Sequence, residues 1–146
     1  MIWRIVNPLT IAIANSPLHF LISHSILVLK FRGVKSGKKY AIPVSYIKVG
    51  DKQVCCVTDR PNIWWRNLKN VDALDIMFKG NSVRATITIE FQNNTAIADK
   101  LDAICSHSRI DGFFAGVGYQ NNSPIRQDID KAAERMTLIE LHIQEP

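Results

Sequence analysis

The apolar positions downstream of Ser25 follow the two-residue period of a β-strand. Leu27, Leu29 and Phe31 alternate with their neighbours, so residues 26–32 are predicted to form a largely buried first strand. Further segments rich in β-branched, aromatic or alternating residues predict five more strands, at 40–49, 52–58, 73–79, 82–91 and 137–143. The alternation is clearest in 82–91, where every second residue is polar, so this strand is expected to have one face in water.

Helical spacing appears in three places. Residues 94–106 carry a core-facing stripe at Ile97, Leu101, Ile104 and Cys105. A shorter helix is predicted after Asn62, whose side chain is suited to cap it. The last helix is expected to start at Ser123-Pro124, with a hydroxyl cap and proline at the first position, after a loop that contains Gly112, Gly116 and Gly118.

Short connections join most of these elements. Turns are predicted at residues 33–37 and at Gly80-Asn81, and Gly50-Asp51 is expected to close a hairpin between the second and third strands. Hairpin-linked strands with helices at the start, middle and end favour an α+β antiparallel barrel over a doubly wound parallel sheet. A length of 146 residues is typical of one domain, here 1–146.

The N-terminal segment has no charged residue from Ile5 to Leu29. Polar and proline positions interrupt it, however, and no run of about twenty apolar residues remains to span a membrane. The triplet Ala12-Ile13-Ala14 is similar to a signal-peptidase site, but the apolar stretch before it is short and broken by Asn7-Pro8. We expect residues 1–24 to be an amphipathic helical cover for the barrel or a surface that touches a membrane interface, and not a removable signal.

The positive charge of the chain is concentrated near its start. The formal net charge is +5, and all thirteen acidic residues lie beyond residue 50. Five basic residues fall between positions 30 and 39, namely Lys30, Arg32, Lys35, Lys38 and Lys39. This clustering predicts a local positive potential and an anionic partner.

The predicted turn within this cluster, Gly33 to Gly37, places backbone N–H groups beside a hydroxyl and several ammonium groups. That set of donors suits a phosphate. The spacing is not that of a P-loop, and a solvated basic hairpin tip is the alternative interpretation.

Three landmarks occur in order along the chain: Gly33-Val34-Lys35-Ser36-Gly37-Lys38, then Pro43-Val44, then Trp64-Trp65-Arg66-Asn67-Leu68. From about Leu18 to the C-terminus the sequence thereby resembles the deazaflavin-dependent nitroreductase family, small relatives of the flavin-binding split barrels. The resemblance implies a six-stranded antiparallel split β-barrel with flanking helices.

The resemblance also implies a cofactor site. Lys35, Ser36, Gly37 and Lys38 would hold the phosphate and anionic tail, while Pro43, Val44, Thr58 and Trp64 would lie near the ring system. Val34 stands where the family often has arginine and Tyr40 where a basic residue is common, so Arg60 is expected to act as a substitute cationic contact. The cofactor itself stays open between the 5-deazaflavin coenzyme F-420, FMN and none.

Other chemistry has little support in the sequence. The four histidines have neither metal-ligand spacing nor a nearby carboxylate cluster, so no metal site is expected. Nucleophile signatures of hydrolases are missing, and the three cysteines are interpreted as reduced core thiols. Trp65 is expected to be a core residue, whereas Trp64 is assigned to either the core or the ring contact.

The sequence therefore predicts a cytoplasmic or membrane-associated oxidoreductase in which bound deazaflavin or FMN reduces a quinone, nitro compound or enone. Catalytic side chains stay unassigned, because the cofactor carries the chemistry. A homodimer is also expected. The alternatives are a noncatalytic basic barrel that binds single-stranded nucleic acid, or one that sequesters a flavin or haem without turnover.

Overall fold

The structure, a computed structural model, describes residues 26–144, apart from the side chains of Ile110 and Phe114. The predicted N-terminal cover, 1–24, lies outside these residues. Within them, no helix is long and apolar enough to cross a lipid bilayer.

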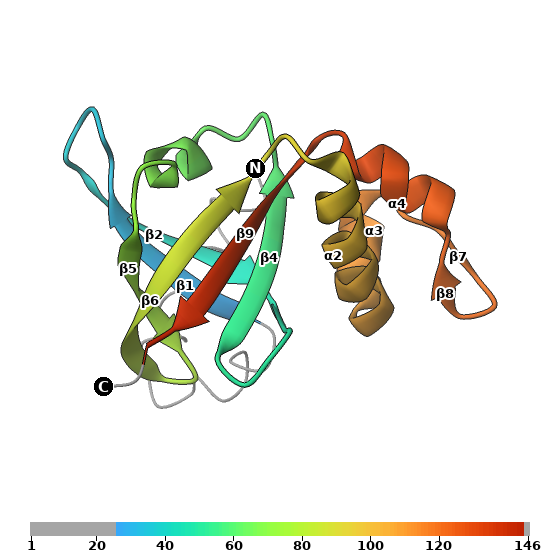
Figure 1. Cartoon of the computed structure of the whole chain (residues 1–146), viewed down its shortest axis with the longest axis horizontal. Coiled ribbons are helices and arrows are strands. Elements are labelled where there is room, and N and C mark those ends of the chain that lie inside the picture. The colour runs from blue at the N-terminus through green and yellow to red at the C-terminus, as the bar shows by residue number, and fades with distance from the viewer. Residues whose placement is uncertain (1–25, 145–146) are drawn as a thin grey trace.

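A curled seven-stranded sheet dominates the described part of the chain (Figure 1). Its order is β2-β1-β5-β6-β9-β4-β3, and every neighbouring pair is antiparallel. The strands are β1 (Ile26–Arg32), β2 (Lys39–Ser45), β3 (Ile47–Lys48), β4 (Gln53–Asp59), β5 (Ala73–Phe78), β6 (Asn81–Glu90) and β9 (Met136–Ile143). The predicted α+β antiparallel architecture is confirmed.

The strand count differs from the predicted six because the second strand is broken at Tyr46. Ser45 ends β2 and pairs with Ile26 of β1, while Ile47 begins β3 and pairs with Cys55 of β4. One continuous stretch of chain thus supplies both edges of the sheet, which must curl until those edges approach each other. Only the β3 half forms the expected hairpin with the following strand.

The other hairpin turn is shifted by one residue from its prediction. Phe78 pairs with Asn81, so the turn is Lys79-Gly80 and not Gly80-Asn81. Both turn residues have positive φ angles, 50° and 80°, as a type I′ turn requires. This geometry matches the twist of the flanking strands. Along β6 the predicted wet face is confirmed, since Arg84, Thr86 and Thr88 are exposed.

Helices gather at one side of the sheet (Figure 1). They are α2 (Asn94–His107), α3 (Arg109–Ala115) and α4 (Arg126–Ala133), with a short 3-10 helix, η2 (Trp64–Leu68), at the other end of the molecule. Helix α2 carries the predicted stripe and is capped by Asn93, whose side-chain oxygen accepts from the Ala96 N–H at 3.1 Å.

Three local predictions are wrong. The glycine-containing segment is not simply a loop, because α3 (Arg109–Ala115) includes Gly112. Ser123-Pro124 is strand β8, paired with β7 (Tyr119–Gln120), and α4 starts after Ile125 without a side-chain cap. Asn62 does not cap η2 but donates to the Thr58 hydroxyl at 3.2 Å. The Asn62 side chain is engaged by Thr58, and Ser123 is paired with Gln120, which the sequence does not reveal.

Two hydrophobic clusters lie on opposite faces of the sheet. The barrel cluster packs Trp65 and Leu68 of η2 against the concave strands and includes Leu27, Ile76 and Ile139. The helix-side cluster joins α2 and α4 to the sheet and includes Leu101, Ile104, Ile129 and Leu138. Adjacent Cys55 and Cys56 fall in different clusters, as strand alternation predicts.

Candidate functional site

The β1–β2 connection, residues 33–38, is called the basic turn below. It closes by two main-chain hydrogen bonds, from Gly33 N–H to the Lys38 carbonyl at 2.8 Å and from Gly37 N–H to the Gly33 carbonyl at 2.9 Å. Gly37 has a φ of +67°, which only glycine adopts readily. The Ser36 hydroxyl accepts from Lys38 N–H at 3.2 Å. The turn is therefore closed by defined hydrogen bonds, while residues 34–38 are exposed.

This arrangement leaves donors facing outward. Among the residues described, the main-chain N–H groups of Lys35 and Ser36 have no hydrogen-bond partner, and Lys35 through Lys38 are exposed. None of the nearby cations Arg32, Lys35, Lys38 and Lys39 forms an ion pair within 26–144. Successive free N–H groups with unpaired ammonium groups around them are the donor set of an anion-binding turn.

Asn67 ties the basic turn to η2. Its side-chain oxygen accepts from Val34 N–H at 2.9 Å, and its side-chain nitrogen donates to the Trp64 carbonyl at 3.0 Å. One amide thus bridges two segments that are 33 residues apart. The bridge fixes the position of Trp64 relative to the N–H donors of the basic turn.

An aromatic row follows directly from the turn. Phe31 stacks on Tyr40 with ring centroids 5.6 Å apart, and on Trp64 at 6.2 Å. Tyr40 is 37% exposed and Trp64 is half-buried, so the row has an accessible side. Trp65, in contrast, is 2% exposed and its indole N–H donates to the Arg60 carbonyl at 3.0 Å. The expected core role of Trp65 is confirmed.

The remaining residues assigned to the ring lie along the strands. Pro43 is buried in the middle of β2 opposite Val28, and the next residue, Val44, is half-buried against the barrel cluster. Thr58 is near the end of β4, where its hydroxyl accepts from Asn62. The structure brings the basic turn and Trp64 together through Asn67, whereas no described contact links Pro43, Val44 or Thr58 to that group.

Arg60 is held by main-chain carbonyls. Its Nε and Nη2 donate to the Met136 carbonyl at 3.1 and 2.6 Å, and Nη2 also reaches the Ala133 carbonyl at 3.3 Å. A third partner is the Asn94 side-chain oxygen at 3.4 Å. These bonds satisfy the Met136 carbonyl at the start of β9 and the Ala133 carbonyl at the end of α4, a position that favours a cation. Only Nη1 has no partner among the described residues, so the predicted cofactor contact would have to use that nitrogen.

Sequence reasoning missed the parts that hold this site together. Phe31 was not assigned to it, and Tyr40 was noted only as a departure from the family's basic residue, although the two are cross-strand partners in β1 and β2. Asn67 was recognised only as part of a landmark. An aromatic residue at each end of a short glycine-bounded turn was the available signal, because cross-strand neighbours must touch.

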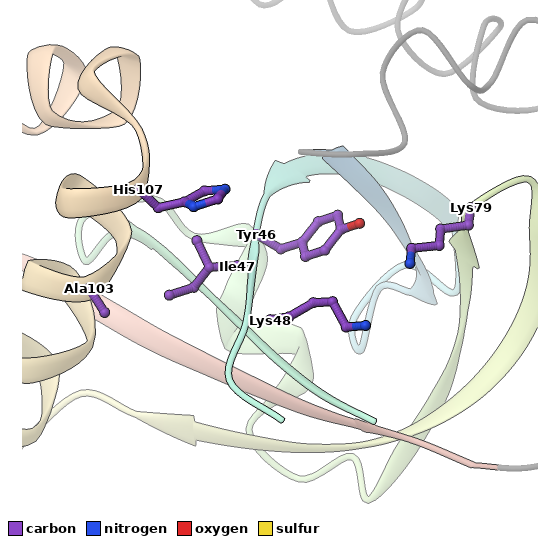
Figure 2. A pocket seen from close by; sticks show the side chains of 6 residues that line it. All are labelled: Tyr46, Ile47, Lys48, Lys79, Ala103 and His107. Atoms are coloured by element: carbon purple, nitrogen blue, oxygen red, sulfur yellow. The ribbon is translucent and has the colours of Figure 1, made fainter. Parts of the chain in front are cut away.

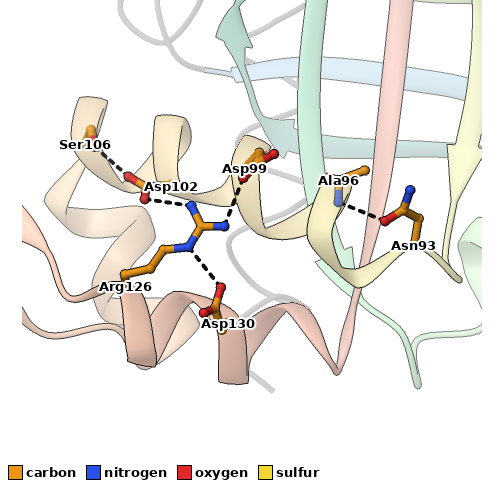
Figure 3. A network of polar contacts seen from close by, with 7 residues as sticks. All are labelled: Asn93, Ala96, Asp99, Asp102, Ser106, Arg126 and Asp130. Atoms are coloured by element: carbon orange, nitrogen blue, oxygen red, sulfur yellow. Dashed lines mark hydrogen bonds and ion pairs between the residues drawn. The ribbon is translucent and has the colours of Figure 1, made fainter.

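A charged cluster centred on Arg126 is structural. Arg126 at the start of α4 donates to Asp99 and Asp102 of α2 and to Asp130, at 2.9, 3.3 and 2.9 Å (Figure 3). This network fastens one helix to the other at the surface. No group of three or more His, Cys, Asp or Glu in the described part of the chain could hold a metal ion.

A cavity of about 430 Å³ lies elsewhere, and we call it the seam cavity (Figure 2). It is lined by Tyr46, Ile47 and Lys48 at the break between β2 and β3, by Lys79 of the β5–β6 turn, and by Ala103 and His107 of α2. The basic turn precedes β2, whereas Tyr46 follows it. The cavity and the basic turn are therefore at opposite ends of one strand.

No protein-family model matches the sequence, and comparison with curated proteins finds no match. The fold is shared with solved structures. A pyridoxamine 5'-phosphate oxidase-related, FMN-binding protein from Nostoc punctiforme PCC 73102 has a TM-score of 0.56 at 12% identity, over 97% of this chain and 80% of that one. A domain-swapped dimer has a TM-score of 0.56 at 11% identity, over 96% and 97%. HutZ, the heme storage protein of Vibrio cholerae, has a TM-score of 0.53 at 9% identity, over 90% and 92%.

Likeness at such low identity establishes the fold alone. The chain has the split-barrel fold found in FMN-binding proteins of the pyridoxamine 5'-phosphate oxidase type. The narrower resemblance to deazaflavin-dependent nitroreductases stays a prediction.

Proposed function

We propose that the protein binds a phosphate-bearing flavin, either FMN or the 5-deazaflavin coenzyme F-420, and uses it to reduce a small organic acceptor such as a quinone, nitro compound or enone. The observation that carries the proposal is the attachment of an anion-binding turn to an accessible aromatic row through Asn67. A flavin of this kind needs both features close together, one for its phosphate and one for its ring.

The residues present fit such a group. The N–H groups of Lys35 and Ser36, with the ammonium groups of Lys35 and Lys38, are free to donate to phosphate oxygens. Trp64 and Tyr40 offer aromatic faces for a planar ring system. The bound cofactor would supply the hydride or electrons, while the protein binds its phosphate, orients its ring and limits the access of water.

The charge distribution weighs against the nucleic-acid alternative. The unpaired cations of β1 and β2 gather around one turn, whereas a single strand of nucleic acid needs a basic groove that follows its backbone. Sequestration of haem or flavin without turnover stays a second candidate, since HutZ shares the fold.

Spectroscopy and titration of the full chain test the proposal. We expect FMN or F-420 to bind and to quench the fluorescence of Trp64, and Trp64→Phe to remove most of that quenching. Lys35→Ala should weaken binding roughly tenfold to a hundredfold, because a charge-assisted hydrogen bond contributes about 1.5–3 kcal/mol. Folding should be unaffected, since Lys35 is exposed.

The matched control is Lys131→Ala, an exposed lysine on α4, which should leave affinity unchanged. Higher salt should weaken the wild type more than Lys35→Ala. Equal affinity of the wild type and Lys35→Ala would remove the phosphate role of the turn. A haem absorption band without cofactor reduction would favour the second candidate. The expected homodimer stays a prediction that light scattering measures directly.

A further inference from the structure

The seam cavity exists because the sheet is not closed by hydrogen bonds between β2 and β3. At Tyr46 the chain leaves the edge next to β1 and joins the edge next to β4, so no ladder spans the gap. Tyr46 belongs to the barrel cluster and Ile47 to the helix-side cluster. The opening therefore lies between the two cores, with α2 along one side.

The walls of the seam cavity are held in place. Tyr46 is 4% exposed and its ring meets the edge of Phe78 at 5.3 Å. The ammonium group of Lys79 lies over the same Phe78 ring at 5.4 Å. Lys79 also has a φ of 50° within the tight β5–β6 turn. The backbone of this lysine is thus fixed at the rim.

Donors and apolar surface are combined in this cavity. In Figure 2 the side chains of Tyr46 and Lys48 extend toward Lys79, whose ammonium end points back toward them. Neither lysine forms an ion pair with a described residue, and no described acidic residue lines the cavity. Burial raises the pKa of Tyr46, so its phenol stays neutral beside the two lysines. Ile47, Ala103 and the tyrosine ring supply the apolar part.

We propose that the seam cavity is a second ligand site, which binds a small aromatic carboxylate. The carboxylate lies between Lys48 and Lys79, and the ring packs on Ile47 and Ala103. A volume of about 430 Å³ is within the range of small-molecule sites. Six residue steps of β2, at roughly 3.3 Å each, put this site about 20 Å from the basic turn. It is independent of the proposed cofactor site.

The isotope-labelled full chain is titrated with sodium benzoate, and separately with benzamide, an uncharged probe of the same shape. Binding is monitored through the amide chemical shifts in NMR spectra. Benzoate should move the signals of residues 46–48, 79 and 103–107, and benzamide should bind more weakly. Lys48→Gln and Lys79→Asn should each weaken benzoate binding about threefold to tenfold, allowing for screening at a partly open site. Asparagine is chosen at position 79 because it tolerates a positive φ.

Lys35→Gln is the control, since it removes a cation from the basic turn and should leave benzoate affinity unchanged. Lys79→Asn should conversely leave FMN affinity unchanged, so failure of one site is separable from failure of the other. Absence of benzoate binding, equal binding of benzamide, or shifts confined to residues 33–39 would overturn the proposal. So would unchanged affinity in both lysine variants of the seam cavity.

Discussion

At the scale of single residues, neighbours in sequence have different roles because they face different surroundings. Trp64 stacks on Phe31 near the surface, while Trp65 is enclosed by the barrel cluster and donates to the Arg60 carbonyl. Arg60 in turn satisfies carbonyls of α4 and β9. The sequence identifies Trp64, Trp65 and Arg60 as candidates for the site. Only their packing in the structure distinguishes a residue that is accessible to a ligand from one that is used in the core.

Arg60 provides a stability test at this scale. Arg60→Met keeps a long side chain but removes every donor, and it leaves the carbonyls of Ala133 and Met136 without this partner. Hydrogen bonds to charged groups contribute about 1.5–3 kcal/mol. We therefore expect the free energy of unfolding, measured with urea, to fall by about 2–4 kcal/mol.

Arg126→Met is the comparison. Its three carboxylate partners are at the surface and the arginine side chain is 47% exposed, so solvent screens the attraction. Surface pairs of this kind contribute about 0.2–1 kcal/mol. A loss for Arg126→Met as large as that for Arg60→Met would contradict the structural role of Arg60.

At the scale of elements, alternation in the sequence was sufficient to place β1, β5, β6 and β9 within a residue or two. It did not locate the break at Tyr46, because both halves of that segment have β-forming residues and only their partners differ. The predicted β5–β6 turn was one residue too far along the chain for a similar reason, since strand pairing in the sheet sets the register.

Of the candidate site, the basic turn and Trp64 could be predicted from the sequence. The bridge by Asn67 could not, because it depends on a contact between segments that are distant in sequence.

Gly112 shows how an element can depend on one missing side chain. It lies in α3, where a Cβ would collide with the hydroxyl and ring of Tyr119, including its Cζ at 2.8 Å. Tyr119 cannot move aside freely because its hydroxyl donates to the Cys105 carbonyl at 2.7 Å. Gly112→Ala should therefore destabilise the protein by about 1–3 kcal/mol, despite the better helix propensity of alanine.

A thermal unfolding curve measures this effect. Gly50→Ala serves as the matched substitution, since its Cβ would meet only the Gln53 Cβ at an ordinary 3.7 Å. That variant should change stability by no more than about 0.5 kcal/mol. An unaltered melting temperature for Gly112→Ala would mean that α3 does not need the close approach of Tyr119.

At the scale of the whole molecule, one sheet separates two cores and carries two candidate sites at opposite ends of β2. The three cysteines are divided between the two cores. Cys55 and Cys105 are in the helix-side cluster, and Cys56 is in the barrel cluster. All three are buried and free. Their protonation therefore reports on the integrity of the entire fold.

Burial raises the pKa of Cys55 and of Cys105 from 9.0 to about 11, and it also raises the pKa of Cys56. Above pH 9 the unfolded chain loses these protons while the native protein keeps them, so the unfolded state binds fewer protons. The free energy of unfolding must then fall as pH rises from about 9 to 11, whereas below that range the contribution is fully present. Each thiol should account for about 1 kcal/mol between roughly pH 8 and pH 10.

Urea unfolding at those two pH values measures the loss. Buried tyrosines such as Tyr46 change in the same direction, because burial raises their pKa as well. The comparison that isolates one thiol is Cys105→Ala, which should lower stability at both pH values but reduce the difference between them by about 1 kcal/mol. An equal difference in the wild type and in Cys105→Ala would mean that this thiol ionises as readily in the native protein as in the unfolded chain. The helix-side core would then have to admit water, which its fully buried residues argue against.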